Sequence, residues 1–330
     1  MTQPDISVFG AGSYGTALAI QLARNGARVA LWGRDAAALE RIGAEGVNAR
    51  YLPDCPFPEG LEVCADLATA AAAGRWLLAV PSHALQAMLA QLAPCWRPGV
   101  DIVSAAKGFA PDSAQMPHEL VAAALPQARF VAISGPTFAR EVGRGVPSAV
   151  TIAARDAELA GDVAEQLHGP GMRAYTSDDV IGVAVGGGVK NVVAIAVGAA
   201  DGLGLGANTR ALLITRGLSE MGRLAEALGG RGETLRGLAG LGDLVLTCTD
   251  DQSRNRRFGK ALGRGDDLDE AAREIGQVVE GVRNAVEVHT LAERHGVDMP
   301  IASEVYRVLH QGSPVLEAFH RLAARPQRAE

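Results

Sequence analysis

The feature of this chain that most constrains its fold is a glycine-rich turn close to the amino terminus. A short apolar run, Ile6 to Phe9, leads directly into the turn Gly10-Ala11-Gly12-Ser13-Tyr14-Gly15, and a segment of helical character, 16–25, follows. A second apolar run, 28–32, comes next, so the segment is expected to form a strand, a turn, a helix and a strand. That order and length predict a dinucleotide-binding βαβ unit.

Each glycine of the turn has a separate role in this prediction. Gly10 permits the tight turn, Gly12 lets the backbone approach a pyrophosphate, and Gly15 lets the helix and the strand pack closely. The N–H groups at the helix start would then bind the anion. A tight turn without a ligand is the alternative, but the flanking strands and helix favour dinucleotide binding.

The choice of cofactor depends on the residues directly after the second strand. NAD enzymes place an acidic residue there for the ribose 2′-hydroxyl, and an arginine nearby accommodates the 2′-phosphate of NADP. This chain has Arg34 followed by Asp35. NADP(H) is therefore favoured and NAD(H) stays an alternative, while an ordinary exposed loop charge is the other reading of Arg34.

Further strands are expected at 76–80, 101–105 and 130–134, and a strand at 148–153 would extend the same sheet. In an open parallel sheet, ligands bind beyond the carboxyl ends of the strands. Lys107 and the segment Ser134-Gly135-Pro136-Thr137 follow two of these ends. Lys107 would meet an anionic ligand there.

A single lysine, Lys190, interrupts an otherwise uncharged run that extends from Val180 to Ala200. About 20 apolar residues would be enough for a membrane span. The central lysine and several glycines argue against one and favour a buried helix in a soluble domain. An ammonium group in such surroundings is either a side chain that reaches solvent along its apolar stem or a catalytic cation in a partly dry site.

The second half of the chain shows helical patterns and no strand alternation. Helices are expected at 209–228, 269–275, 281–295 and 302–309. A chain of 330 residues with 48% hydrophobic content is long enough for two domains. The prediction is an α/β fold, with a dinucleotide-binding domain over 1–185 followed by a helical substrate and catalytic domain over 186–330.

Two polar features of the second half belong with Lys190. Asp243 is a lone carboxylate in the apolar segment 238–248 and is a natural partner for a buried lysine. The run Ser253-Arg254-Asn255 looks like a helix start with Ser253 as its cap. Free N–H groups, the helix dipole and Arg254 would together hold a phosphate. The alternative is a solvated basic helix start.

Composition limits the class of partner. A net charge of -6 argues against a nucleic-acid partner. Four cysteines without zinc or CxxC spacing, and an amino terminus without a targeting pattern, indicate a reduced, cytoplasmic chain. No ligand cluster suggests a metal site.

Several segments together carry a resemblance to a known family. They are GAGSYGTALA, AAKG, SGPTFAREV, GGGVKNVVAIAVGAADGLGLGANTRALLITRGL, LAGLGDLVLTC, SRN and GQVVEGVRN. In these segments, which are spread over nearly the whole length of the chain, it resembles bacterial NAD(P)-dependent glycerol-3-phosphate dehydrogenases. The resemblance implies a Rossmann-type domain followed by an all-helical domain like the C-terminal domain of 6-phosphogluconate dehydrogenase. It also implies reversible reduction of dihydroxyacetone phosphate to sn-glycerol 3-phosphate with NAD(P)H, which supplies the glycerol backbone of phospholipids.

The same resemblance assigns residues to roles. It implies that Lys190 is the proton acceptor and donor, with Lys107 and Asp243 as further catalytic residues. Together with the turn glycines Gly10, Gly12 and Gly15, the cofactor-binding positions are Ser13, Tyr14, Arg34, Lys107, Ala139, Arg254, Val278 and Glu280. Substrate-binding positions are Lys107, Gly135, Thr137, Lys190, Asn191, Asp243, Ser253, Arg254 and Asn255.

Two residues depart from the family pattern. Gly188 stands where alanine or threonine is common, and Thr137 stands where serine is common. Neither change removes a reacting group, although Gly188 is expected to loosen the start of the Lys190 helix.

Two other functions fit parts of the pattern. A sister 2-hydroxyacid or 3-hydroxyacid dehydrogenase with the same two-domain plan would bind a carboxylate where this chain is expected to bind a phosphate. A non-enzymatic NADPH-binding sensor would explain the glycine turn but would leave Lys190, Asp243 and the SRN run without a common purpose. A homodimer is the default expectation for the assembly. The sequence leaves open whether Lys190 transfers the proton or mainly stabilises the oxyanion.

Overall fold

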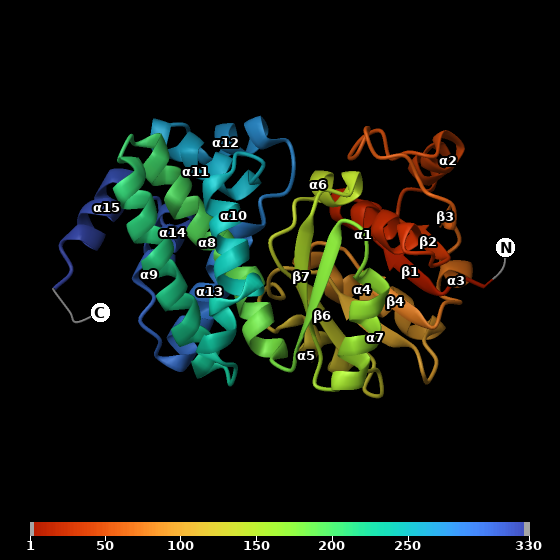
Figure 1. Ribbon diagram of the computed structural model, residues 1–330. Coiled ribbons are helices and arrows are strands. Elements are labelled where there is room, and N and C mark those ends of the chain that lie inside the picture. Colours follow the sequence, from red (N-terminus) through yellow and green to blue (C-terminus); the bar gives the residue numbers. More distant parts are fainter. Residues whose placement is uncertain (1–2, 327–330) are drawn as a thin grey trace. The chain divides into compact units, whose positions relative to one another are not determined.

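A computed structural model describes residues 3–326 of the chain (Figure 1). The chain divides into two compact units. The first holds residues up to Ala110 together with Gln115–Ala184, and the second holds Pro111–Ala114 together with the residues from Val185 onward. The division falls inside a continuous helix, α8 (Val180–Gly202). Gly188 therefore lies well inside a helix and not at its start, contrary to the expectation from sequence.

The first unit is built on an eight-stranded sheet with the order β3-β2-β1-β4-β5-β6-β7-β8. The strands are β1 (Ile6–Phe9), β2 (Val29–Trp32), β3 (Leu61–Val63), β4 (Arg75–Leu78), β5 (Asp101–Ser104), β6 (Phe130–Ser134), β7 (Ser148–Ala153) and β8 (Met172–Ser177). The first six have the strand order of dinucleotide-binding folds. β7 runs antiparallel to β6, whereas the other neighbouring strands are parallel.

The structure confirms the strand predicted at 148–153, and this strand, β7, is antiparallel to β6 in a sheet whose other pairs are parallel. Two strands were not predicted. β3 has only three residues, and β8 is a partly exposed edge strand with no continuous apolar run. The helix after the glycine turn, α1 (Ser13–Arg24), begins three residues before the predicted start, directly at the turn.

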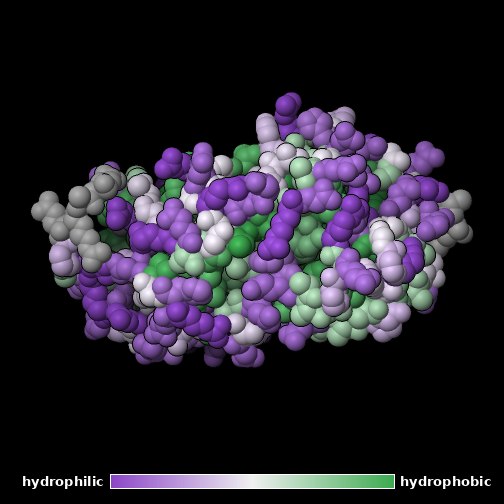
Figure 2. All heavy atoms as spheres, turned by 90° about the horizontal axis from the view of Figure 1, so that it is seen from below, coloured by the Kyte–Doolittle hydropathy of each residue, from purple (hydrophilic) through white to green (hydrophobic). Residues whose placement is uncertain are grey.

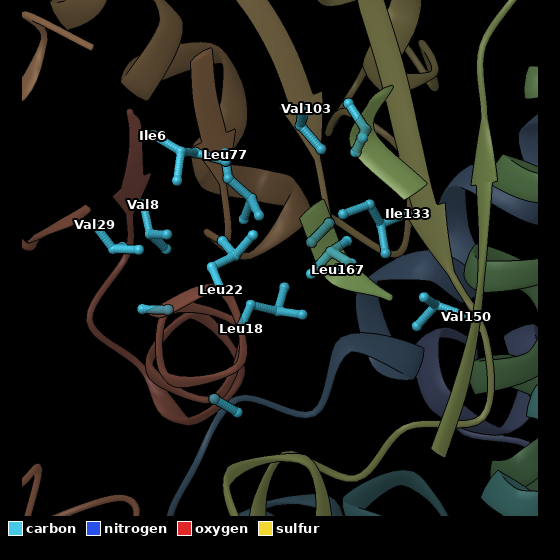
Figure 3. Close-up of a cluster of buried hydrophobic side chains, with 14 of the residues drawn as sticks. Ile6, Val8, Leu18, Leu22, Val29, Leu77, Val103, Ile133, Val150 and Leu167 are labelled. Atoms are coloured by element: carbon cyan, nitrogen blue, oxygen red, sulfur yellow. The ribbon is translucent and has the colours of Figure 1, made fainter. Parts of the chain in front are cut away.

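Helices cover both faces of this sheet (Figure 1). They are α1, α2 (Ala36–Glu45), α3 (Leu67–Ala70), α4 (Leu85–Leu92), α5 (Pro117–Ala124), α6 (Ala139–Arg144) and α7 (Ala157–Leu167). Because successive side chains of a strand point to opposite faces, Val8 joins one buried cluster and Phe9 the other. Figure 3 shows the first cluster, in which Leu18 and Leu22 of α1 lie beneath the strands.

The described residues of the second unit form helices and connecting loops and include no strand, as predicted. It contains most of α8, together with α9 (Gly206–Ala227), α10 (Asp243–Thr249), α11 (Arg254–Arg264), α12 (Leu268–Ile275), α13 (Glu280–His295), α14 (Pro300–His310) and α15 (Val315–Ala323). A 3-10 turn over Gly232–Arg236 and a π-helical turn over Leu238–Gly242 precede α10.

α8 forms the core of this unit. Of the described helices, it is the one that is long and apolar enough to cross a membrane, yet 89% of its most apolar window is buried inside the protein. Hydrophilic residues cover much of the face of the molecule drawn in Figure 2. A helix that is apolar on all sides and already covered by protein is a core helix, so α8 gives no sign of a membrane span.

α8 and α11 pack with their backbones in contact, and glycines on both helices make this approach possible. A Cβ atom added to Gly202 would lie 2.8 Å from Cα of Gly263, and one added to Gly259 would lie 2.9 Å from the amide nitrogen of Ala199. Both glycine pairs, Gly198 with Gly202 and Gly259 with Gly263, are spaced by four residues and so lie on one face of their helix. The contact fixes the separation of the two helices.

Replacing one of these packed glycines by alanine is expected to destabilise the protein. Replacing a helical glycine that has empty space beside it is expected to stabilise the protein. Gly259→Ala should lower the free energy of unfolding by about 2 kcal/mol, because the methyl group overpacks the contact. Gly222→Ala, in α9, has no described atom within 4 Å of its Cβ position, and it should raise the free energy by about 0.5–1 kcal/mol. Urea unfolding would measure both. Equal effects of the two changes would contradict the packing account.

A buried carboxyl group, Glu220 of α9, joins that helix to the start of α14. Its Oε1 accepts a hydrogen bond from the amide of Ile301 (2.7 Å) and its Oε2 accepts one from the amide of Ala302 (3.1 Å). Burial nevertheless raises the pKa of Glu220 to about 7, while the two amide donors and Arg223 act in the other direction and Asp298 adds to the rise.

This raised pKa predicts how stability depends on pH. Between the ordinary pKa of 4.5 and about 7, the folded protein binds more protons than the unfolded chain. The contribution of Glu220 to the free energy of unfolding should therefore be largest below that interval and fall by about 3 kcal/mol as pH rises through it. Glu220→Gln should flatten this slope in urea titrations at pH 5 and pH 7.5. Part of the slope remains, because burial also raises the pKa of Glu287 to about 7. An unchanged slope in the variant would exclude Glu220 as its source.

Candidate active site

The glycine turn of the first unit has the geometry expected of a phosphate-binding turn. Gly10 has φ +124°, and a Cβ atom there would lie 2.5 Å from the carbonyl oxygen of Ala79. Gly12 precedes α1 as its N-cap and offers no side chain to the first N–H groups of the helix. No described atom lies within 4 Å of the Cβ position of Gly12. The turn thus combines free helical N–H groups with open space, which suits a bound anion.

Four of the predicted site residues meet at the carboxyl ends of the strands of this unit. Lys107, which follows β5, donates a hydrogen bond to the carbonyl oxygen of Gly135 (3.0 Å), and its ammonium lies 5.5 Å from the ring centroid of Tyr14. The hydroxyl groups of Tyr14 and Thr137 are hydrogen-bonded to each other at 2.9 Å. The structure therefore gathers Tyr14, Lys107, Gly135 and Thr137 around one cation.

The remaining candidates of the first unit lie at its edge or in its core. Arg34 is exposed after β2. Asp35 is occupied as the N-cap of α2, where its carboxylate accepts a hydrogen bond from the amide of Ala38 (3.0 Å). Ala139 begins α6 and packs against the buried cluster. Ser13 is the first residue of α1.

In the second unit, Lys190 is buried and meets the carboxylate predicted as its partner. The ammonium of Lys190 donates a hydrogen bond to Oδ1 of Asp243 and another, 3.0 Å long, to the hydroxyl of Thr247. The residue exposures are 5% for Lys190 and 1% for Asp243. A buried charge is tolerated when it is paired and hydrogen-bonded, and this pair satisfies both conditions.

Thr247 is a third member of this buried cluster, and the sequence-based prediction did not name it. It is buried one turn after Asp243 on α10, and its hydroxyl donates to the carbonyl oxygen of Asp243 (2.6 Å) while it accepts from Lys190. The spacing of four residues was a usable signal, because such residues share one face of a helix. Its neighbour Cys248 is also buried, and burial raises the pKa of this thiol to about 12.

Next to the ion pair, asparagine side chains join three helices. Asn255 donates a hydrogen bond to Oδ1 of Asn191 (2.9 Å) and accepts one from the amide of Gly281 (2.9 Å). Asn284 of α13 donates to the carbonyl oxygen of Gly188 (3.0 Å). Asn191, which follows Lys190 in the chain, is therefore hydrogen-bonded directly to Asn255, which follows Arg254.

The start of α11 has the predicted form. The hydroxyl of Ser253 caps the helix by accepting a hydrogen bond from the amide of Arg256 (3.2 Å). Arg254 is half-buried and contacts the side chain of Gln277 (3.3 Å). Arg256 is buried in an ion pair with Asp201 (2.6 Å), so the two arginines serve different purposes. Val278 is exposed, and Glu280 begins α13.

Over residues 3–326, no group of three or more His, Cys, Asp or Glu side chains is placed to hold a metal ion. The charged side chains in the contacts described above are Lys107 in the first unit and Lys190, Asp243 and Arg254 in the second. A dinucleotide-type turn on a doubly covered sheet, together with a buried lysine and a capped helix start that carries Arg254, is the arrangement expected of a nicotinamide-dependent oxidoreductase.

Comparison with known proteins identifies the family within that class. Residues 5–160 match the N-terminus of NAD-dependent glycerol-3-phosphate dehydrogenase, and residues 179–320 match its C-terminus. The chain is 54% identical to a glycerol-3-phosphate dehydrogenase [NAD(P)+] of Thioalkalivibrio sulfidiphilus over the full length of both chains. It is 53% identical to that of Halorhodospira halophila, with 98% of each chain covered. The crystal structure of glycerol-3-phosphate dehydrogenase from Coxiella burnetii matches with a TM-score of 0.94 and 47% identity, over 98% of this chain and 99% of that one. The chain belongs to the NAD-dependent glycerol-3-phosphate dehydrogenase family.

Proposed function

We propose that this protein catalyses the reversible reduction of dihydroxyacetone phosphate to sn-glycerol 3-phosphate with NAD(P)H, and so supplies the glycerol backbone of glycerophospholipids. The observation that carries the proposal is the link between a buried proton donor and an anion-binding helix start. Lys190 is paired with Asp243, and the next residue, Asn191, is hydrogen-bonded to Asn255 beside Arg254. A ketone that carries a phosphate requires both groups.

The first unit, proposed as the cofactor domain over 1–185, fits a nicotinamide dinucleotide. The open space at Gly12 and the uncapped start of α1 would accept the pyrophosphate. Because Asp35 is engaged as a helix cap while Arg34 is exposed, we infer a preference for NADP(H) over NAD(H) through a 2′-phosphate contact with Arg34. Ser13, Tyr14 and Ala139 are proposed to line the same cofactor, together with Val278 and Glu280.

The chemical step is assigned to the residues of the second unit, over 186–330. When bound, NAD(P)H supplies a hydride to the ketone carbon. Negative charge then develops on the carbonyl oxygen, and the ammonium of Lys190 stabilises it and donates a proton to it. Asp243 and Thr247 hold the ammonium in place. In the oxidative direction, Lys190 accepts the proton of the substrate hydroxyl.

Binding of the substrate phosphate is assigned to Arg254, Ser253, Asn255 and the N–H groups at the start of α11. Charge-assisted hydrogen bonds from an arginine to a phosphate are among the stronger polar contacts. This remote binding energy would position the carbonyl group near Lys190. Lys107, with Gly135 and Thr137, is proposed as a second substrate contact, since its ammonium lies at the carboxyl ends of the strands.

The sister hydroxyacid dehydrogenase and the NADPH sensor make different predictions from this proposal. Arg254 alone could bind a carboxylate or a phosphate, whereas the helix start beneath it adds donors suited to a phosphate. A sensor would have no use for the buried Lys190–Asp243 pair. We further propose a cytoplasmic location, supported by the four free cysteines, and a homodimer as the default assembly.

The proposal is tested directly by following the loss of reduced-nicotinamide absorbance as NADPH or NADH is oxidised. We expect the purified protein to oxidise NADPH with dihydroxyacetone phosphate, to do so less well with NADH, and to be inactive with small 2-keto acids. Activity with 2-keto acids alone would establish the sister dehydrogenase. Tight NADPH binding without turnover of any ketone would establish the sensor.

The role assigned to Thr247 predicts a specific kinetic effect. Thr247→Val keeps the side-chain shape but removes one acceptor from Lys190, so kcat should fall by about tenfold. The KM for dihydroxyacetone phosphate should change little, because Thr247 is not assigned to phosphate binding. Thr249→Val is a matched control, since the hydroxyl of Thr249 bonds its own helix at Val245 (2.7 Å) and is exposed. Equal kcat values for the two variants would refute the assignment.

A further inference from the structure

Asn48 is a completely buried polar residue, with 0% exposure, that has no part in the proposed active site. It lies in the loop that follows α2. The two ends of this loop are held together, because the amide of Phe57 donates to the carbonyl oxygen of Gly46 (2.8 Å) and Val47 forms an antiparallel bridge with Pro56. Asn48 is therefore presented by a closed loop with little freedom.

The side chain of Asn48 bonds to two points of the glycine turn. Its Nδ2 donates to the carbonyl oxygen of Ala11 (3.0 Å) and to the hydroxyl of Thr16 (2.9 Å). A carbonyl oxygen can only accept, so the amide nitrogen must face Ala11. Both N–H donors of Nδ2 are thus used within the turn and the first turn of α1. Within residues 3–326, the Oδ1 atom accepts no hydrogen bond.

The bond to Ala11 sets the orientation of a peptide plane. The described chain has no cis peptide bonds, and in a trans peptide the C=O and the following N–H point in opposite directions. Asn48 holds the oxygen of Ala11 on its own side, so it directs the N–H of Gly12 to the opposite side. Within the turn, Gly12 has open space at its Cβ position. Because glycine has no side chain of its own, its backbone conformation is less restricted than that of other residues.

A side chain that only filled this space would be apolar, because a buried amide is unfavourable unless it is hydrogen-bonded. Asn48 leaves its own oxygen without a partner among the described residues while it satisfies the turn. The side chain of Asn48 therefore stabilises the conformation of the glycine turn, although its own oxygen gains no hydrogen bond from the described residues.

We propose that Asn48 is a positioning residue for the dinucleotide pyrophosphate: it holds the Ala11–Gly12 peptide so that the N–H of Gly12 faces the anion. The inference rests on the proposed function, in particular on dinucleotide binding by the first unit. Asn48 lies 37 positions after Ala11 and outside the glycine motif.

The test compares two ligands on variants of the full-length protein. Asn48→Ala and Asn48→Leu remove the donor, and the second keeps a similar side-chain volume. The Kd for NADPH, measured by calorimetry, should rise by about tenfold, the value of one oriented hydrogen bond. The Kd for 2′-AMP, which lacks the pyrophosphate, should stay within about twofold because its contacts lie elsewhere.

Asn25→Ala provides the matched control. The Nδ2 of Asn25 also donates to two backbone oxygens of the first unit, those of Gln166 (2.9 Å) and His168 (3.2 Å), but it lies at the end of α1 away from the turn. This variant should lose thermal stability and keep the Kd for NADPH within about twofold.

The outcomes separate this inference from the proposed function. Unchanged NADPH binding by Asn48→Leu, equal weakening of NADPH and 2′-AMP, or loss of the fold in both variants by circular dichroism would each overturn the positioning role alone. Wild-type protein that binds neither NADPH nor NADH would overturn the proposed function, and the inference with it.

Discussion

A lysine and an aspartate buried in an apolar helical unit must meet each other, because each charge alone would be strongly unfavourable there. Lys190 lies at the centre of α8, an almost wholly buried helix. Asp243 follows the π-helical turn directly, as the first residue of α10, and pairs with Lys190. Thr247 completes the pair from the same face of α10. The pairing confines the position of the ammonium, and that confinement suits the role proposed for Lys190 as a donor to a developing oxyanion.

The proposed anion site is joined to this pair by contacts that leave little freedom. Glycines let the backbones of α8 and α11 touch, the Asn191–Asn255 hydrogen bond joins the two helices near the ion pair, and the buried Arg256–Asp201 pair joins them again further along. The spacing between Lys190 and the start of α11 is thus set by backbone packing and short side chains. Sites on such rigid elements hold reacting groups more closely than sites on loops.

Much of this arrangement could be predicted from the sequence, because it depends on local signals. The glycine turn, the Ser253 cap and the need of a lone buried lysine for a carboxylate follow from residue type and spacing. The antiparallel β7 could not be predicted, since strand direction is set by tertiary pairing, and β3 and β8 are too short or too exposed to show a pattern. No local signal distinguishes Arg254 from the buried Arg256, or indicates that a loop brings Asn48 back to the turn.

The central claim is that Lys190 and Asp243 act as one unit in the chemical step, and a double-mutant cycle tests it most directly. The quantity to measure is kcat/KM for dihydroxyacetone phosphate with Lys190→Met, Asp243→Asn and the double variant, each checked for its fold by circular dichroism. Groups that act as a unit show strongly non-additive effects. The account predicts that the double variant is no slower than Lys190→Met alone. Losses that multiply, so that the double variant is slower by the product of the two single effects, would contradict it.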